Sequence, residues 1–331
     1  MAANAPLLSV RDLSIEFRGK RSLRAVSDVS FDVQVGETLA VVGESGCGKS
    51  ITARAIVRLL PSNASTKGSI SLAGRELLTL PEREMEDVRG SQIGFIFQDP
   101  FTALNPLMTV GQQLMDVQRR HLGLDRVAAR QGAIELLERV RIPQAQRRVD
   151  DYPHQMSGGM RQRAAIAIAI AARPKLLIAD EPTTALDVTI QGQLLQLLHT
   201  LQKSMDMGLL LITHDLGVVA ETADRVAVMY AGTKVEEQSV WHMFDHPRHP
   251  YTRALIDARP RIGERRTFLN EIPGMVPSLA DMPSGCAFAD RCTYAQPACR
   301  TSRPLPTAFP DGSVACLRQA EFSPGAAAPT A

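Results

Sequence analysis

Residues 43–50 form the segment whose residue types and spacing most directly predict chemistry. They read GESGCGKS and match the phosphate-loop pattern G-x-x-x-x-G-K-[ST]. The glycines let backbone N–H groups turn inward around phosphate oxygens, and Lys49 would place its ammonium group on the β- and γ-phosphates of ATP. Ser50 would offer a hydroxyl group to Mg²⁺, and the helix that follows would direct its positive N-terminus at the anion. The residues expected at the nucleotide are Gly43, Glu44, Ser45, Gly46, Cys47, Gly48, Lys49, Ser50 and Ile51.

Two adjacent carboxylates are the second candidate for chemistry. Residues 176–179 are apolar, which predicts a strand buried on both faces, and Asp180 and Glu181 follow directly. At the end of such a strand, Asp180 could reach Mg²⁺ through water, and Glu181 could polarise a water that attacks phosphate. Taken alone, an acid pair that only solvates a turn is an equally good interpretation.

A serine and two glycines predict a second anion site. Ser157, Gly158 and Gly159 stand directly before Met160 and an Ala/Ile-rich helix. Such residues at a helix start can form a cup of backbone N–H groups around an anion. One γ-phosphate does not need two such cups from one chain. A dimer does need them, if the second cup of each chain closes on the ATP of the other.

The segments that must position these residues alternate between strands and helices. Such alternation predicts an α/β fold with a largely parallel sheet. A region rich in Arg, Glu, Gln and Leu, about residues 80–155, predicts a helical insertion, with clear helical spacing at residues 126–140. A helix is expected from Lys49 to Pro61. The strands are predicted near residues 15–17, 29–35, 38–42, 70–72, 176–179, 209–213 and 225–232, the last of these being the final strand expected.

The bulk composition narrows the class of protein. The chain has 331 residues and a net charge of +2, too balanced for a nucleic-acid-binding protein, so no nucleic-acid partner is expected. It contains no run of about 18 apolar residues that could cross a bilayer, and its N-terminus lacks the pattern of a secretion signal. We expect a cytoplasmic protein that reaches a membrane only through partner proteins.

Four of the five cysteines gather near the C-terminus. Cys286, Cys292, Cys299 and Cys316 are spaced C-x5-C-x6-C-x16-C, without the short C-x2–4-C step that is usual for zinc. Four thiolates could instead hold a [4Fe–4S] cluster, and thiols packed as small apolar groups are a third interpretation. Cys47 is expected to pack inside the phosphate loop. His246 and His249, each followed by a proline, are expected to form a turn rather than a metal site.

These motifs together resemble an ATP-binding subunit of an ABC transporter, over roughly residues 7–260. The phosphate loop, Gln98, the Ser157-Gly158-Gly159 signature, Asp180-Glu181, Ala185-Leu186-Asp187 and His214 stand in the order and spacing of that family. Met156 and Met160 depart from its commonest signature, which begins with Leu and ends in Gln, but the phosphate-binding core is intact. The fold implied is a P-loop NTPase core with an N-terminal antiparallel β region, a helical insertion and a small irregular C-terminal extension.

The resemblance also implies roles for single residues. Glu181 and His214 would be catalytic, and Mg²⁺ would be bound through Ser50, Gln98 and Asp180. Asp187 would organise the dimer interface, where the signature would meet the ATP of the other subunit. Phe17 matches the position at which the family stacks an aromatic ring on adenine, and a core strand residue is an equally good interpretation of it.

The C-terminal part resembles the peptide-importer branch of that family. The segments HPRHPYT, IPGMVPSL and PSGCAFADRC, within residues 232–320, carry this resemblance, and members of the branch import dipeptides, oligopeptides, nickel or glutathione. It implies an extension at residues 261–320, which the composition predicts to be followed by a disordered tail at residues 321–331, and it favours the iron–sulfur interpretation of the cysteines. The implied partners are a second ABC ATPase (a paralogue or another copy), two permease subunits and an external substrate-binding protein.

The expected function is therefore ATP hydrolysis that drives uptake of di- or oligopeptides, at the cytoplasmic face of the inner membrane. Nickel or glutathione uptake is the nearest alternative. A soluble ABC protein of translation or DNA repair is a further alternative, but such proteins commonly carry two cassettes in one chain. This sequence has one phosphate loop and one signature.

Overall fold

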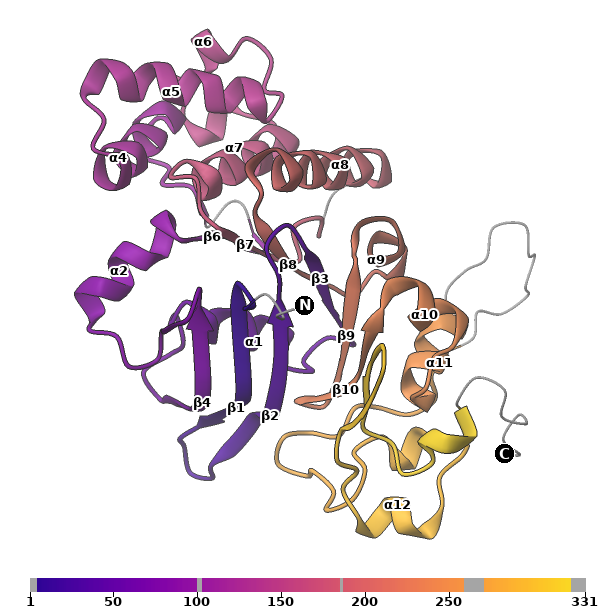
Figure 1. Ribbon diagram of the computed structural model, residues 1–331. Coiled ribbons are helices and arrows are strands. Elements are labelled where there is room, and N and C mark those ends of the chain that lie inside the picture. Colours follow the sequence, from indigo (N-terminus) through magenta and orange to yellow (C-terminus); the bar gives the residue numbers. More distant parts are fainter. Residues whose placement is uncertain (1–4, 100–102, 185–186, 259–270, 323–331) are drawn as a thin grey trace. The chain divides into compact units, whose positions relative to one another are not determined.

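The computed structural model describes residues 5–99, 103–184, 187–258 and 271–322. Figure 1 shows its helices and strands. By its internal contacts the chain divides into two compact units. The first unit comprises residues 1–9, 32–38 and 71–212, and the second comprises residues 10–31, 39–70 and 213–331. The predicted tail falls largely on residues 323–331, which lie outside the described residues.

The sheet of the first unit holds the strand that ends in the acid pair. Strand β7 (Leu176–Asp180) is buried at all five residues. It pairs in parallel with β6 (Ile93–Ile96) on one side and with β8 (Gly208–Thr213) on the other. The predictions of buried strands near 176–179 and 209–213 are confirmed. Strand β6 was not predicted, because four residues are too few to show a period within a region that is otherwise helical.

Helices make up most of the rest of the first unit. Several begin at a side chain that caps the backbone: Thr109 and Gln112 form a capping box, and Asp125 accepts a hydrogen bond from the backbone N–H of Ala128. The predicted helix at 126–140 is confirmed within one residue. The remaining elements of this unit are α2 (Glu82–Ser91), α4 (Val110–Leu122), α5 (Arg126–Arg139), α6 (Ala145–Arg148), η1 (Pro153–Gln155), α7 (Gly158–Ile170), α8 (Val188–Met205) and the short strand β5 (Arg75–Glu76).

The second unit has two groups of strands. In one group the order is β3-β9-β10-β12-β11, with β3 and β9 parallel and the later pairs antiparallel. In the other group the order is β2-β1-β4. The bounds are β1 (Leu8–Phe17), β2 (Leu23–Val33), β3 (Thr38–Val42), β4 (Ala64–Leu72), β9 (Arg225–Tyr230), β10 (Thr233–Ser239), β11 (Thr307–Phe309) and β12 (Gly312–Val314). One or two residues at one end of each of β1, β2, β3 and β4 belong to the first unit.

The prediction that residues 225–232 are the last strand is wrong. Strand β10 follows β9 after a two-residue turn at Ala231 and Gly232, and β12 and β11 extend the same sheet. The sequence of β10, TKVEEQS, hides this strand because three consecutive polar residues, Glu236 to Gln238, are buried in it. The sheet of this unit therefore continues into the C-terminal extension.

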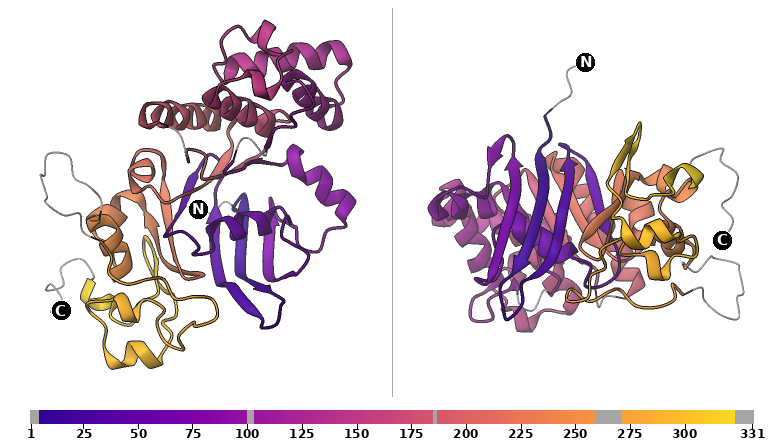
Figure 2. Two further views of the ribbon diagram at one scale, coloured as in Figure 1. Left: turned by 180° about the vertical axis from the view of Figure 1, so that it is seen from behind. Right: turned by 90° about the horizontal axis from the view of Figure 1, so that it is seen from below.

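The described part of the second unit also contains helices. They are α1 (Lys49–Ile56), α9 (Leu216–Thr222), α10 (Val240–Asp245), α11 (Pro250–Asp257), η2 (Ala289–Arg291), α12 (Pro297–Thr301) and η3 (Gln319–Phe322). Of these, α9, α10 and α11 contribute to the core of the sheet that contains β9 and β10. Helix α1 ends before the predicted Pro61, since Arg58 has a φ of 53° that an α-helix cannot include. Figure 2 shows the C-terminal extension beside the strands and helices of residues 225–257.

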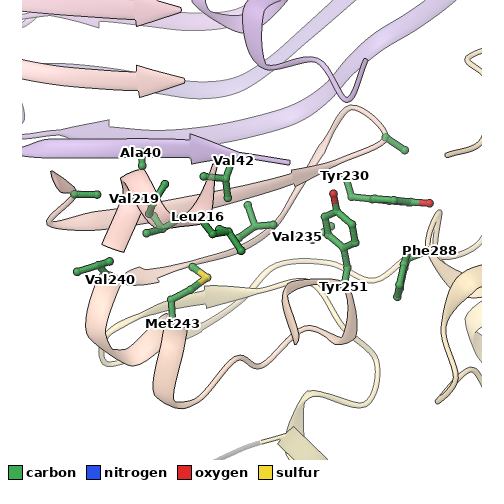
Figure 3. Packing of buried hydrophobic residues seen from close by; sticks show 14 residues of the cluster. Ala40, Val42, Leu216, Val219, Tyr230, Val235, Val240, Met243, Tyr251 and Phe288 are labelled. Atoms are coloured by element: carbon green, nitrogen blue, oxygen red, sulfur yellow. The ribbon is translucent and has the colours of Figure 1, made fainter. Parts of the chain in front are cut away.

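One hydrophobic core joins β3, β9 and β10 with α9, α10 and α11. Val42, Val219 and Val240 lie in it with Tyr230 and Tyr251, and Phe288 brings the extension into the same cluster (Figure 3). Among the described residues, none of the helices combines the length and the apolar character that crossing a bilayer requires.

Candidate functional site

The phosphate loop lies between β3 and α1, and three of its residues have backbone conformations that favour glycine. Gly43, Gly46 and Gly48 have φ values of 152°, 80° and 101°. A Cβ atom at Gly43 would lie 2.1 Å from the carbonyl oxygen of Met229, and one at Gly48 would lie 3.1 Å from that of Ala25. Only glycine combines these φ values with such close approach. The motif is therefore required by the geometry of the loop.

Lys49 is buried within this loop. It is 4% exposed, and its Nζ atom donates hydrogen bonds to the carbonyl oxygens of Gly43 (2.7 Å) and Glu44 (3.0 Å). A buried ammonium group needs such partners, because its desolvation is costly. The cation is thus held at the inner side of the loop, where a phosphate group could take over these contacts.

The helix after the loop begins without a side-chain cap. Gly48 occupies the N-cap position of α1, and within the described part of the chain no side chain accepts a hydrogen bond there. Ser50 and Ile51 lie in the first turn of this helix. Orphan N–H groups at a helix start favour an anion.

Three other residues predicted at the nucleotide lie in the second unit. Cys47 is fully buried, burial raises the pKa of its thiol, and its carbonyl oxygen accepts a hydrogen bond from Gly232. This agrees with the packing role expected for it. Phe17 ends β1 and is partly buried, which fits both interpretations of it. His214 is exposed and stands directly before Asp215, the N-cap of α9.

In the first unit, two predicted residues meet. Glu181 follows the buried Asp180 directly at the end of β7. Nε2 of Gln98 donates a hydrogen bond to Oε2 of Glu181 at 3.0 Å. Oγ1 of Thr184 donates to the same oxygen, also at 3.0 Å. The two neutral donors orient the carboxylate of Glu181 while leaving it an acceptor.

The backbone of Glu181 is also unusual. Its φ is 47°, in the left-handed region, and its N–H donates to the carbonyl oxygen of Ile212 at 2.9 Å. Such a conformation of a residue with a Cβ atom is strained and persists where neighbouring contacts hold it. The side chain is therefore placed by the structure around it.

Thr184 was not singled out from the sequence. The sequence feature that could have identified Thr184 is a hydroxyl group three positions after Glu181, since a turn can bring such a residue back to the carboxylate. The Thr184 N–H indeed bonds to the Glu181 carbonyl oxygen at 3.2 Å. The resemblance predicts Gln98 at Mg²⁺, and in the structure Gln98 donates a hydrogen bond to Glu181. Thr184 is a second donor to this carboxylate that the sequence analysis did not identify.

The signature lies at the start of α7. Ser157 is its N-cap, and the serine Oγ accepts a hydrogen bond from the N–H of Met160 at 3.4 Å. A Cβ atom at Gly158 would meet nothing within 4 Å, whereas one at Gly159 would have Ile190 as its nearest neighbour. The open space in front of Gly158 suits the approach of an external group. Gln162 on the same helix donates to the carbonyl oxygen of Pro182, next to Glu181 (2.7 Å).

Asp187 occupies the N-cap position of α8. Ala185 and Leu186, which precede it in the predicted motif, lie outside the described residues.

The four C-terminal cysteines line one small cavity. Cys286, Cys292, Cys299 and Cys316 all contribute to its wall, and its volume is about 20 Å³. Burial, together with the neighbouring cysteines, raises the pKa of Cys316 to about 12. Burial likewise raises the pKa values of Cys286 and Cys292. Burial therefore favours the neutral thiol forms of these three cysteines.

The donors do not converge as the ligands of one ion. Within the described ranges, no three His, Cys, Asp or Glu side chains are arranged to hold a single metal ion. His249, near this cavity, has a structural role: it is the N-cap of α11, its Nδ1 accepts from the N–H of Tyr251, and complete burial lowers its pKa to about 3.

Comparisons with known proteins found matches over most of the chain. The family described as "ABC transporter" matches residues 26–184, and the family described as "Oligopeptide/dipeptide transporter, C-terminal region" matches residues 235–299. A probable peptide ABC transporter ATP-binding protein of Sinorhizobium fredii is 52% identical over 320 residues, which cover 95% of this chain and 96% of that protein.

Solved structures show the same fold. A dimeric post-hydrolysis structure of the ATP-binding cassette MJ0796, bound to ADP and Pi, aligns with a TM-score of 0.63 and 26% identity, over 70% of this chain and 98% of that one. A cbiO1 protein from Clostridium perfringens, part of an ABC transporter complex, aligns with a TM-score of 0.62 and 27% identity, over 72% and 91% of the two chains. The predicted α/β fold of the P-loop NTPase type is confirmed.

Proposed function

We propose a function from one premise: the chain belongs to the ABC transporter family of ATP-binding proteins. It is an ABC-type ATPase. In our proposal it hydrolyses Mg-ATP to power the import of di- or oligopeptides. The named peptide transporter relative and the match of residues 235–299 to an oligopeptide/dipeptide transporter region support this cargo.

The nucleotide would bind at the phosphate loop. Lys49 would exchange its bonds to the carbonyl oxygens of Gly43 and Glu44 for bonds to the β- and γ-phosphates. The backbone N–H groups of the loop and of the α1 N-terminus would surround the phosphate oxygens. Ser50, Gln98 and Asp180 would hold Mg²⁺, which neutralises charge on the phosphates. Phe17 would stack on the adenine.

Hydrolysis would depend on Glu181. Its carboxylate would orient and polarise the attacking water, while His214 would contact the γ-phosphate. In a dimer, the signature residues Ser157, Gly158 and Gly159 would close on the γ-phosphate held by the other subunit, with Asp187 at the interface. Loss of that phosphate after hydrolysis would remove a contact between the subunits and let the dimer open.

The observation that carries the catalytic proposal is the paired hydrogen bond to Glu181. Gln98 and Thr184 hold the same carboxylate oxygen at 3.0 Å each. An acid pair that only solvates a turn would not need two side-chain donors from separate segments. A preorganised carboxylate is what positioning of a water molecule requires.

The test is the variant Glu181→Gln. ATP turnover should fall at least about a hundredfold, the range in which a catalytic base contributes, while the affinity for ATP stays within about twofold. Phosphate release and equilibrium binding of Mg-ATP would be measured on the same preparation. Retained turnover would remove Glu181 from this role. Asp206→Asn, at the C-terminal cap of α8, is a matched control that should change neither quantity.

The partners belong to the same proposal. A second ABC ATPase (a paralogue or another copy of this chain), two permease subunits and an external substrate-binding protein would complete the importer, with this chain bound at the cytoplasmic face of the inner membrane. The dimeric structure of the MJ0796 cassette supports the pairing of cassettes. Uptake of labelled dipeptides, nickel and glutathione by cells that carry or lack the chain would identify the cargo.

The four C-terminal cysteines, which line one cavity, would bind a [4Fe–4S] cluster. The cavity of about 20 Å³ would have to widen to admit it. Iron, zinc and acid-labile sulfide would be measured in the anaerobically purified chain and in Cys292→Ser. About four irons and four sulfides per chain, lost in the variant, is the expected result. About one zinc per chain would instead indicate a structural zinc site. If iron, zinc and sulfide are all absent, the cysteines are packed as free thiols.

A further inference from the structure

Glu44, the second residue of the phosphate loop, is bound by an arginine of the C-terminal extension. Arg291 forms a bidentate ion pair with it: the two guanidinium nitrogens lie 2.7 Å and 3.0 Å from the two carboxylate oxygens. The arginine side chain is only 6% exposed and that of Glu44 is 28% exposed. An ion pair this far from water is screened far less than one on the surface.

The backbone of Glu44 is held as well. Its N–H donates to the hydroxyl of Tyr251 at 2.9 Å, and its carbonyl oxygen accepts from Lys49 at 3.0 Å. Tyr251 is fully buried and lies against the rings of Tyr230 and Phe288 (Figure 3). The start of the loop is therefore tied to the core that the extension completes.

The guanidinium group of Arg291 has hydrogen-bond partners besides Glu44. It donates to the carbonyl oxygens of Pro273 (2.8 Å) and Ile272 (3.1 Å) and to the hydroxyl of Tyr230 (3.3 Å). The guanidinium group thus has partners that do not depend on the loop. A planar group held in this way meets a carboxylate in one defined geometry.

The charge of Glu44 is unfavourable for a phosphate-binding loop. ATP brings several negative charges to the loop, and a carboxylate within about 8 Å would repel each by roughly 1 kcal/mol at an intermediate dielectric constant. The ion pair cancels this charge where it arises. The bidentate contact therefore has a consequence for nucleotide binding besides packing.

We propose that Arg291 is a positioning residue for nucleotide binding: it acts through Glu44, cancelling the carboxylate charge at the phosphate loop so that the loop accepts the phosphates of ATP. The extension thereby sets the nucleotide affinity of the cassette. The residue that does so is the direct sequence neighbour of Cys292, so the cysteine region and the phosphate loop are connected through one side chain. The inference rests on the proposed binding of ATP at residues 43–50.

The test uses the full-length chain, with Mg-ATP and Mg-ADP as probes in titration calorimetry. Arg291→Gln should weaken binding of Mg-ATP about tenfold, as expected for an uncancelled charge, and binding of Mg-ADP by less, because ADP carries less charge. Glu44→Gln added to Arg291→Gln should restore most of the lost affinity. The matched control is Arg300→Gln, which removes an exposed arginine of the same extension paired with Asp290 and should leave affinity unchanged.

Two outcomes would overturn the inference. One is an unchanged Mg-ATP affinity in Arg291→Gln. The other is a double variant as weak as Arg291→Gln, since a merely structural role is not rescued by removing the opposite charge. If Arg291→Gln does not fold, Glu44→Gln alone decides: its Mg-ATP affinity should increase, because the positive charge of Arg291 is then uncancelled beside the loop, and an unchanged or lower affinity would contradict the inference. If the unmodified chain does not bind Mg-ATP, the proposed function fails, and this outcome is distinct from a failure of the inference about Arg291.

Discussion

Two loops of this protein follow buried strands and are built in opposite ways. The phosphate loop after β3 uses backbone: three glycines with positive φ shape it, and a Cβ atom at the first of them would lie 2.1 Å from a neighbouring carbonyl oxygen. The turn after β7 uses side chains: Glu181 keeps a Cβ atom at a φ of 47°, and Gln98 and Thr184 hold its carboxylate.

The difference reflects the two tasks. Binding several phosphate oxygens needs many N–H groups in a small volume, which only close packing of backbone supplies. Polarising one water molecule needs one carboxylate at a defined position, which neighbouring side chains supply. Changes in the first loop should therefore affect affinity and folding, and changes in the second should affect turnover.

The largest effect is expected for Lys49→Ala. The variant removes the buried cation of the phosphate loop, so Mg-ATP affinity should fall about a hundredfold or more, in keeping with the strength of charge-assisted hydrogen bonds. Equilibrium binding of Mg-ATP measures this directly. An affinity equal to that of the unmodified chain would mean that Lys49 does not contact phosphate.

Two glycine variants test whether close approach of the backbone, as well as a positive φ, requires glycine in the phosphate loop. Gly43→Ala should destabilise the chain by about 3 kcal/mol, because its Cβ atom would overlap the carbonyl group of Met229. Gly46→Ala meets nothing within 4 Å and should cost only the roughly 1–2 kcal/mol of a left-handed φ. Urea unfolding of both variants gives the comparison. Equal losses would show that φ alone, and not close approach, requires these glycines.

The smallest effect is expected in the second loop. Thr184→Val keeps the shape of the side chain and removes one hydrogen bond to Glu181, so kcat should fall about three- to tenfold, the equivalent of one hydrogen bond. The KM for ATP should not change, because the residue orients the carboxylate and is not expected to touch nucleotide. Steady-state ATPase kinetics separates the two parameters. A raised KM with unchanged kcat would move Thr184 to the binding part of the site.

Local patterns predicted much of the molecule. Residues 43–50, Ser157 to Gly159 and the acid pair after residue 179 follow from rules that act over a few residues, because turn geometry, helix starts and strand ends depend on near neighbours. The strand β10 did not follow from such rules, because an alternating pattern does not anticipate three consecutive buried polar residues. Glu236 accepts hydrogen bonds from the backbone of Arg248 and His249, and Glu237 pairs with Arg225 and Lys234.

Long-range contacts were decided only by the tertiary structure. Gln98 and Glu181 are 83 positions apart, and Glu44 and Arg291 are 247 apart. The family resemblance indicated a role for Gln98, but nothing in the types or spacing of Glu44 and Arg291 predicts that they meet. Their pairing depends on how Tyr230, Tyr251 and Phe288 pack the extension against the rest of the second unit. Sequence determined which residues could bind phosphate and activate water, and packing decided which distant charges lie beside them.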